Sequence, residues 1–420
     1  MRHFAAIPRL LPEDDLQAMF ERGQFDALIP AVRERMSEDP GTLTDPFVKQ
    51  WVGIRWRDLF LKAAMTDDKA IAETRKLPGP LRHLPVGGGG DPDMRRALAN
   101  RFLKDLSLVD LEIELPPAQY DEIANTSMVL VPGMLTGLLH PGAHAFPTEA
   151  DELQAERGWR YYRCDAHTLR GCDANSADII ETMDDGLVYD MSSRERITTE
   201  PPGDVFLIGY SKGGPDIIHF LVNHPEYASR VRAVFTWAGA MRGSYSADSI
   251  YDQIKDLDVK SSTDRLAGVL SMINPSVISA AGLRRMDEYD VIGAFDDLRT
   301  STSEAYLNEH ADYLNGLGIP FFSVTGATTP FEVPNFQFAD TVRTTKFDAN
   351  NDMQLTQAQA TMPIDMSTRV AMLHGHHWDI AYAPFPPQMR AASPNLDHPF
   401  PKKAALTANW ELLAELGVID

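Results

Sequence analysis

A serine between two glycines stands where a strand-like segment runs into a helix-like one. Gly209-Tyr210-Ser211-Lys212-Gly213 follows the apolar run 204–208 and precedes the segment 214–222, which has helical spacing. The run 204–208 is short and is bounded by Pro201-Pro202-Gly203, which predicts a buried strand. Because a direct strand-to-helix turn brings backbone segments close together, glycines on either side of the serine leave room for it. The pattern therefore predicts a sharp turn that exposes Ser211.

Strands and helices alternate along the chain from about residue 126. Six strands are predicted, at 127–131, 159–164, 204–208, 231–237, 320–325 and 368–373. Further helices are predicted at 148–157, 175–196, 214–222 and 354–362. Strands separated by helices indicate a parallel sheet with right-handed crossovers. Residues 244–314 contain several helical segments and no predicted strand, which indicates an insertion over one end of the sheet.

Residues 1–118 differ from this pattern, so we expect an N-terminal helical extension followed by an α/β domain at 119–420. Helices are predicted at 13–25, 47–65 and 93–106, separated by proline and glycine. The four glycines 87–90 are interpreted as a connector. A phosphate-binding loop would need a preceding strand and a following Lys-Ser/Thr pair, and neither is present.

Charge and composition argue against several classes of partner. The formal net charge of -21 over 420 residues disfavours nucleic acid and anionic membranes, since both need a positive protein surface. No run approaches the roughly 18 apolar residues of a membrane span, and the N-terminus lacks the apolar core of a secretory signal. Cys164 and Cys172 are therefore expected to be thiols in a cytoplasmic protein. A homo-oligomer stays open.

The order of these elements resembles that of the α/β-hydrolase superfamily, and residues 126–390 are similar to its lipase and esterase-like members. The resemblance makes the pentapeptide 209–213 a nucleophile elbow, and it implies that an acid and then a histidine follow Ser211 in the chain. It also implies the α/β-hydrolase fold, a mostly parallel sheet flanked by helices, with 244–314 as a helical lid.

The resemblance places the histidine in the loop after the last strand, where His374, His376 and His377 lie close together in the sequence. His377 is favoured because it directly precedes an aromatic residue on a loop that opens into a helix, and His376 is the alternative. His374 is expected to lie at the strand end and to point elsewhere. Three histidines within four residues do not easily face one ion, and no cysteine or paired carboxylates complete a shell, so no metal is expected.

The acid is expected after the penultimate strand. Asp352, in an Asn-Asp turn before the histidine, is the first candidate, and Asp348 is the alternative. Asp340 and Asp365 are weaker candidates. Many relatives have a glycine after this acid, where this chain has Met353. An aspartate in such a turn also suits a helix N-cap.

Negative charge that develops on a carbonyl oxygen needs pre-aimed N–H donors. The resemblance implies that one donor is the backbone N–H of Lys212 and that the other lies in the loop 131–136. Pro132 has no N–H, so Met134 is the first candidate and Leu135 the second. The Lys212 side chain is expected to pair with a carboxylate of the protein.

These residues together predict a serine hydrolase without a cofactor. Ser211 would attack an acyl carbonyl, His377 would move the proton and Asp352 would orient the imidazole. The expected substrate is a carboxylic ester with an apolar acyl group, because the loop is apolar and the helical insertion suits a lid. His140 and His144 are candidates for lining the acyl pocket. An acyltransferase, a thioesterase and a non-catalytic binding protein stay as alternatives.

Overall fold

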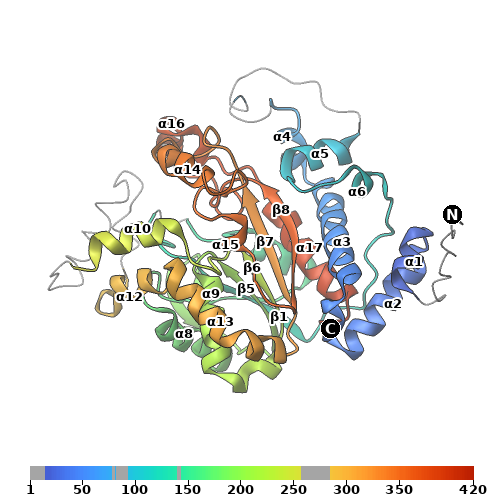
Figure 1. Ribbon diagram of the computed structural model, residues 1–420, viewed down its shortest axis with the longest axis horizontal. Helices are drawn as coiled ribbons and strands as arrows, with labels where there is room; N and C mark the ends of the chain where they lie inside the picture. Colours follow the sequence, from blue (N-terminus) through green and yellow to red (C-terminus); the bar gives the residue numbers. More distant parts are fainter. Residues whose placement is uncertain (1–14, 78–80, 82–92, 140–142, 257–283) are drawn as a thin grey trace, which may run out of the picture.

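The computed structural model describes residues 15–77, 81, 93–139, 143–256 and 284–420. The glycines 87–90, His140 and the middle of the expected insertion lie outside this part. At the centre is a six-stranded parallel sheet with the order β2-β1-β5-β6-β7-β8 (Figure 1). Its strands are β1 (Thr126–Val131), β2 (Tyr161–Arg163), β5 (Asp204–Tyr210), β6 (Val231–Trp237), β7 (Phe321–Ala327) and β8 (Ser367–His374). The predicted parallel sheet is confirmed.

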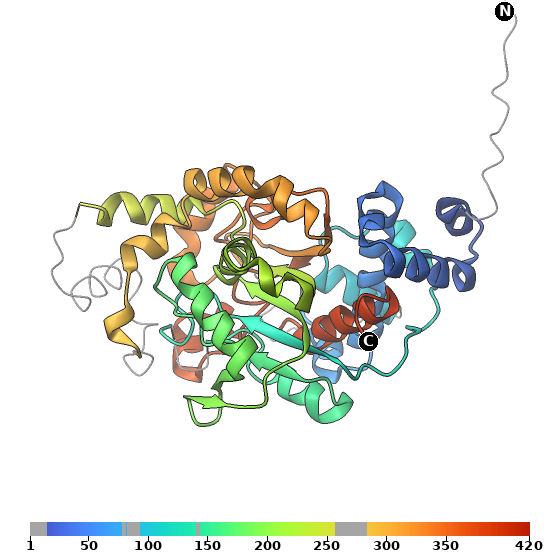
Figure 2. The ribbon, with the colours of Figure 1, turned by 90° about the horizontal axis from the view of Figure 1, so that it is seen from below.

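Helices cover both faces of the sheet (Figures 1 and 2). One layer consists of α3 (Pro46–Ala64), α7 (Glu149–Arg157) and α17 (Lys402–Glu415), and the other of α8 (Cys172–Asp185), α9 (Gly213–Asn223) and α13 (Thr300–Gly316). Alternate residues of β5 point to opposite faces. Phe206 and Ile208 join the hydrophobic cluster on the α3 and α17 side, whereas Val205 and Leu207 join the cluster with α9. Burial on both faces explains why the strand reads as a continuous apolar run.

The N-terminal region shares its core with the sheet. It contains α1 (Leu16–Glu21), α2 (Phe25–Glu38), α3, α4 (Asp68–Glu73), α5 (Met94–Phe102) and α6 (Leu108–Glu112). Asp45 caps α3 by accepting hydrogen bonds from two backbone N–H groups, and Pro46 occupies its first turn. Trp56 of α3 donates from Nε1 to Asn409 of α17 at 2.8 Å, and the buried Arg55 forms two hydrogen bonds of 2.6 Å with Glu415. These contacts bind α3 tightly to α17.

Several of the predicted helices are shorter in the structure, including those expected at 13–25 and 93–106, where α1 covers Leu16–Glu21 and α5 covers Met94–Phe102. The segment expected as a helix over 175–196 leaves the helical conformation after Asp185, because Gly186 takes φ 62° and stops the helix in the left-handed region. An antiparallel hairpin follows, with strands β3 (Leu187–Asp190) and β4 (Glu195–Thr198). The helix predicted at 354–362 is reduced to α15 (Gln357–Ala360).

The helices of the expected insertion pack in two different places, on one face of the sheet and over the carboxyl ends of its strands. The described ones are α10 (Tyr245–Ile254), α12 (Val291–Asp296) and α13. Leu307 and Leu314 of α13 belong to the cluster that includes Ile217 of α9, so α13 is part of the layer covering the sheet. In contrast, α10 and α12 pack against residues of the loops that follow β1, β6 and β7, which places them over the carboxyl ends of these strands.

The remaining helices are α14 (Phe338–Thr345), which follows β7, and α16 (Pro387–Ala392), which follows β8. Short 3-10 helices occur in several of the connections. Within the described ranges, no helix combines the length and apolarity that a bilayer crossing requires.

Candidate active site

Ser211 lies at the turn between β5 and α9 in a strained backbone conformation. Its φ of 54° falls in the left-handed region, and its amide donates to the carbonyl of Trp237 at 3.1 Å. The neighbouring backbone leaves no room for side chains: a Cβ at Gly209 would lie 2.5 Å from the Gly213 carbonyl oxygen, and a Cβ at Gly213 would lie 2.3 Å from that of Val131. The glycines of the motif are therefore required by close packing, as the sequence indicated.

His377 and Asp352 are brought together by the loops after β8 and β7. The distance from His377 Nδ1 to Asp352 Oδ2 is 2.7 Å, and the residues are 2% and 1% exposed. The other carboxylate oxygen accepts hydrogen bonds from the amides of Gln354 and Leu355 at 2.9 and 2.6 Å. Each oxygen of the carboxylate thus has a partner, which fixes its orientation toward the imidazole.

The turn that holds Asp352 places Met353 in a backbone conformation that side chains rarely adopt. Met353 has φ 88°, in the region that favours glycine, and its amide is held by the Asn351 side chain at 3.0 Å. The alternative acid, Asp348, is used elsewhere: its oxygens accept from the amides of Asn350 and Gln357, both at 2.8 Å.

The second ring nitrogen of His377 is free. His377 Nε2 is buried and has no hydrogen-bond partner among the described residues. Tyr210, directly before Ser211, donates its hydroxyl to the His377 carbonyl at 3.1 Å, and the two rings are 5.1 Å apart. An imidazole that donates from Nδ1 to a carboxylate keeps the lone pair of Nε2 available as a base. The contact made by Tyr210 was not predicted from the sequence, because the position before the serine in the motif accepts many residues.

The neighbouring histidines face other partners. His374 Nε2 lies 3.0 Å from Glu332 Oε1. Burial alone would raise the pKa of Glu332, but hydrogen bonds from His374 and Thr329 outweigh it and lower the pKa to about 2. His376 Nε2 lies 3.0 Å from the carbonyl oxygen of Asn395, away from Asp352. The structure therefore pairs only His377, among these three, with Asp352.

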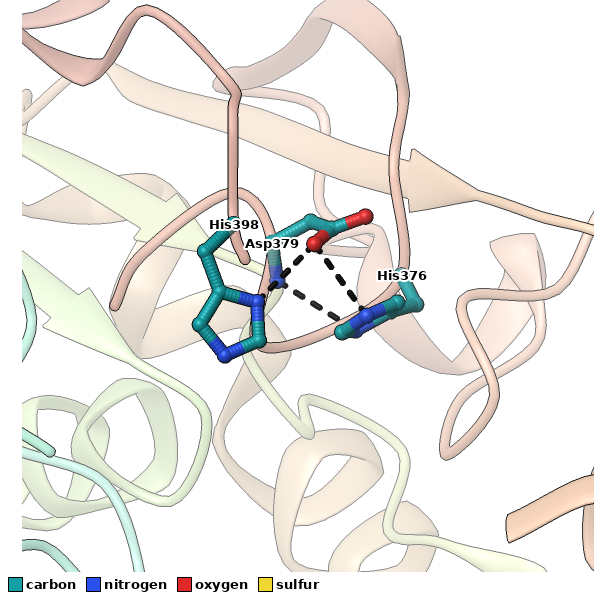
Figure 3. Close-up of side chains that lie close together, drawn as sticks. All are labelled: His376, Asp379 and His398. Atoms are coloured by element: carbon teal, nitrogen blue, oxygen red, sulfur yellow. Dashed lines mark hydrogen bonds and ion pairs between the residues drawn. The ribbon is translucent and has the colours of Figure 1, made fainter. Parts of the chain in front are cut away.

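His376 also takes part in a second buried group, with Asp379 and His398 (Figure 3). One ligand atom of each residue lies within 4.8 Å of the others, a spacing that a metal ion would also use. However, His376 Nδ1 accepts from the amides of Trp378 and Asp379 at 3.3 Å, so its Nε2 carries the proton and acts as a donor. His398 Nδ1 contacts Asp379 Oδ1 at 2.9 Å. We interpret the group as a hydrogen-bonded network that ties the His377 loop to the segment around His398.

The loop after β1 packs directly against the elbow. A Cβ on Gly133 would lie 2.8 Å from Ser211 Cβ and 3.0 Å from the Tyr210 carbonyl oxygen. The amides of Met134, Leu135 and Lys212 donate no hydrogen bond to any described residue. Unpaired backbone donors are uncommon in folded proteins. Their position beside a serine is suited to binding an oxyanion.

The Lys212 side chain is directed into the protein, and its predicted pairing with a carboxylate is confirmed. It is 1% exposed, and its Nζ contacts Asp216 Oδ1 at 2.5 Å. Burial favours the neutral amine, but the Asp216 carboxylate outweighs it and raises the pKa of Lys212. Asp216 also accepts from Asn175 at 3.0 Å. Only the backbone of Lys212 therefore faces the site.

No protein-family model and no curated protein sequence matches this chain. Among solved structures, it is similar to that of a metagenomic carboxyl esterase, MGS0156, with a TM-score of 0.57 and 19% identity over 85% of this chain and 90% of that chain. EstA from Clostridium botulinum gives a TM-score of 0.43 at 13% identity, over 84% and 98% of the two chains. A Staphylococcus hyicus lipase gives 0.41 at 14% identity, over 64% and 91%. The similarity to the metagenomic esterase, together with the strand order, confirms the predicted α/β-hydrolase fold.

Proposed function

We propose that this protein is a serine hydrolase that cleaves a carboxylic ester through an acyl-enzyme. The observation that carries the proposal is the buried pair of His377 and Asp352, 2.7 Å apart, in which His377 Nε2 has no partner among the described residues. The loop of His377 is held next to the strained turn of Ser211 by the hydrogen bond from the Tyr210 hydroxyl to the His377 carbonyl. A buried polar atom without a partner, such as His377 Nε2, costs about 1–3 kcal/mol and needs a reason. A general base must keep one nitrogen free.

In the proposed reaction, the Ser211 hydroxyl attacks the ester carbonyl while His377 Nε2 takes its proton. The resulting imidazolium is stabilised by the Asp352 carboxylate, and the negative charge on the former carbonyl oxygen is stabilised by the amides of Lys212 and of Met134 or Leu135. His377 then returns the proton to the departing alcohol, which leaves an acyl-enzyme. A water molecule, deprotonated by His377, releases the acid and restores Ser211.

An apolar acyl group is supported by the surroundings of the loop after β1. Met134 and Leu135 pack against a hydrophobic cluster to which α10 and α12 contribute Ile250, Tyr251 and Phe295. An acyl chain that leaves the carbonyl on this side meets apolar side chains. We propose that α10 and α12 act as the lid over this part of the site.

The first experiment is labelling with a fluorophosphonate probe, which reacts with activated serines, alongside hydrolysis of p-nitrophenyl butyrate. We expect the wild type to be labelled and active, and Ser211→Ala to be neither. Ser301→Ala, which changes an exposed serine on α13, serves as the matched control and should behave like the wild type. An unlabelled, inactive wild-type protein would refute the proposed function.

A further inference from the structure

A small pocket is lined in part by the loop after β1. Its wall includes Pro132, Thr136 and Gly137 of that loop, next to the Gly133 that contacts Ser211. The opposite wall comes from the residues after β2, the turn of the β3–β4 hairpin, and the segment 284–289. The pocket and the elbow of Ser211 therefore share the loop after β1.

The pocket wall is unusually basic for a chain with a net charge of -21. Arg194, Arg284 and Arg285 line it, with Asp165 as the lining carboxylate. Among the described residues, the charged groups on and directly behind the wall are six arginines and four carboxylates: Arg163, Arg170, Arg194, Arg196, Arg284, Arg285, Asp165, Asp178, Glu181 and Glu288. These described residues thus carry two more positive charges than negative charges.

Two of these arginines, Arg163 and Arg194, form no ion pair with a described residue. Arg163 is buried and donates to the carbonyls of Ala145 and Phe146, so Arg194 is the exposed one of the two. The other four arginines each form an ion pair with at least one of the four carboxylates. Arg194 lies at the hairpin turn with φ 61°, and its amide is fixed to the Asp190 carbonyl at 2.8 Å. An exposed, unpaired guanidinium at the mouth of a pocket is suited to binding an anionic oxygen group.

A second observation inside the pocket also points to a ligand. His144 lines the pocket and is 6% exposed, and its Nε2 is buried without a hydrogen-bond partner in the described part of the chain. Its ring stacks on Tyr189 at 4.7 Å, and Tyr189 in turn carries the Arg284 guanidinium 4.4 Å from its ring centre. Burial, followed by the charges of Arg163, Arg284 and Arg194, lowers the pKa of His144. The ring is therefore neutral and able to share a hydrogen bond with a ligand oxygen.

We propose that this pocket binds a carboxylate carried by the ester substrate, with Arg194 as its principal ion-pair partner and His144 as a hydrogen-bond partner. The inference rests on the proposed function, and it adds the substrate class: an ester that bears a second, anionic carboxylate.

Two matched pairs of substrates test the inference. Mono-p-nitrophenyl adipate and its methyl ester place or remove the carboxylate on the acyl side, and 3-(butyryloxy)benzoate and its methyl ester do so on the alcohol side. We expect kcat/KM to be at least about tenfold higher for the carboxylate in one of the two pairs, and this preference to shrink as salt is added. Equal rates within both pairs would overturn the inference.

The variants Arg194→Gln and Arg284→Gln should lower the ratio of the rates for anionic and neutral substrate toward one. Arg232→Gln removes the same charge at an exposed site paired with Asp204 and should keep the ratio. A preference that survives in Arg194→Gln and Arg284→Gln would contradict the assignment.

A binding measurement separates this inference from the proposed function. Titration of Ser211→Ala with adipate, in which calorimetry measures the heat of binding, needs no catalysis. We expect binding that disappears when Arg194→Gln is added to Ser211→Ala. If the wild type lacks esterase activity while adipate binds in this way, the proposed function fails and the carboxylate pocket stands. If esters are cleaved but neither adipate nor 3-hydroxybenzoate, the product of the alcohol-side substrate, binds in this way, the pocket assignment fails and the hydrolase stands.

Discussion

His376 and His377 are adjacent and both buried, yet their side chains serve different neighbours. His377 contacts Asp352 and keeps Nε2 free, whereas both nitrogens of His376 have partners. We therefore expect His377→Ala to lower kcat for p-nitrophenyl butyrate by about a thousandfold or more. His376→Ala should retain most of the rate per folded molecule. It should also lower the free energy of unfolding by about 2 kcal/mol, because the groups around it lose their hydrogen-bond partners.

Both effects are measured on the same samples, with kcat normalised to the folded fraction and stability taken from urea unfolding. The two readouts separate chemistry from folding, since a purely structural role would change stability and leave the normalised rate alone. If His376→Ala loses the rate and His377→Ala keeps it, the base is His376 and the function of the Asp352 contact must be reconsidered.

At the scale of elements, the sequence predicts the strands well because their signal is local. Each of the six sheet strands lies within two residues of its predicted bounds, since a doubly buried strand needs an apolar run of limited length. The hairpin at 187–198 was predicted as helix, because its strands are short and follow a true helix without a proline. Gly186, which ends the helix in the left-handed conformation, is the residue in the sequence that indicates this boundary.

The residues of the candidate site also divide into those that the sequence identifies and those that only the fold brings together. Ser211, Asp352 and His377 are recognisable because motif and chain order identify them. Arg194 and His144 lie far apart in the sequence, and only the folded hairpin brings them to one pocket. Pairings of this kind depend on tertiary packing, so no local pattern predicts them. The choice between His376 and His377 likewise needed the contact with Asp352.

The loop after β1 depends on the absence of a side chain at Gly133. A Cβ there would lie 2.8 Å from Ser211 Cβ, which is shorter than real contacts of this kind. We expect Gly133→Ala to push the loop and its amides away from the elbow and to lower kcat/KM by at least about a hundredfold, the effect of losing one oxyanion donor. Gly316→Ala is the control, because nothing lies within 4 Å of its added Cβ. Full activity of Gly133→Ala would argue against an oxyanion role for this loop.

Across the whole molecule, buried histidines and buried acids change the free energy of unfolding in opposite directions as the pH falls. Burial lowers the pKa of His167 and of His398 to about 4, so both are neutral in the folded protein at pH 7. Burial raises the pKa of Asp178 and of Glu411. Below pH 6.5 the unfolded chain binds protons at the histidines that the folded chain does not, so the histidines make folding less favourable as the pH falls. Asp178 and Glu411 bind protons at a higher pH in the folded chain than in the unfolded chain, so they make folding more favourable as the pH falls.

His398→Gln isolates one histidine from this balance. In the wild type, the stability that neutral His398 contributes is fully present above pH 6.5 and is lost progressively as the pH falls toward 4. Between pH 6.5 and 5 the loss should amount to about 2 kcal/mol, from a difference in proton affinity over about 1.5 pH units. The gap in unfolding free energy between wild type and His398→Gln should narrow by that amount in urea titrations at pH 7 and 5. A gap that is constant with pH would show that His398 takes up its proton equally in the folded and unfolded chains, and would remove the basis for a neutral imidazole behind the His377 loop.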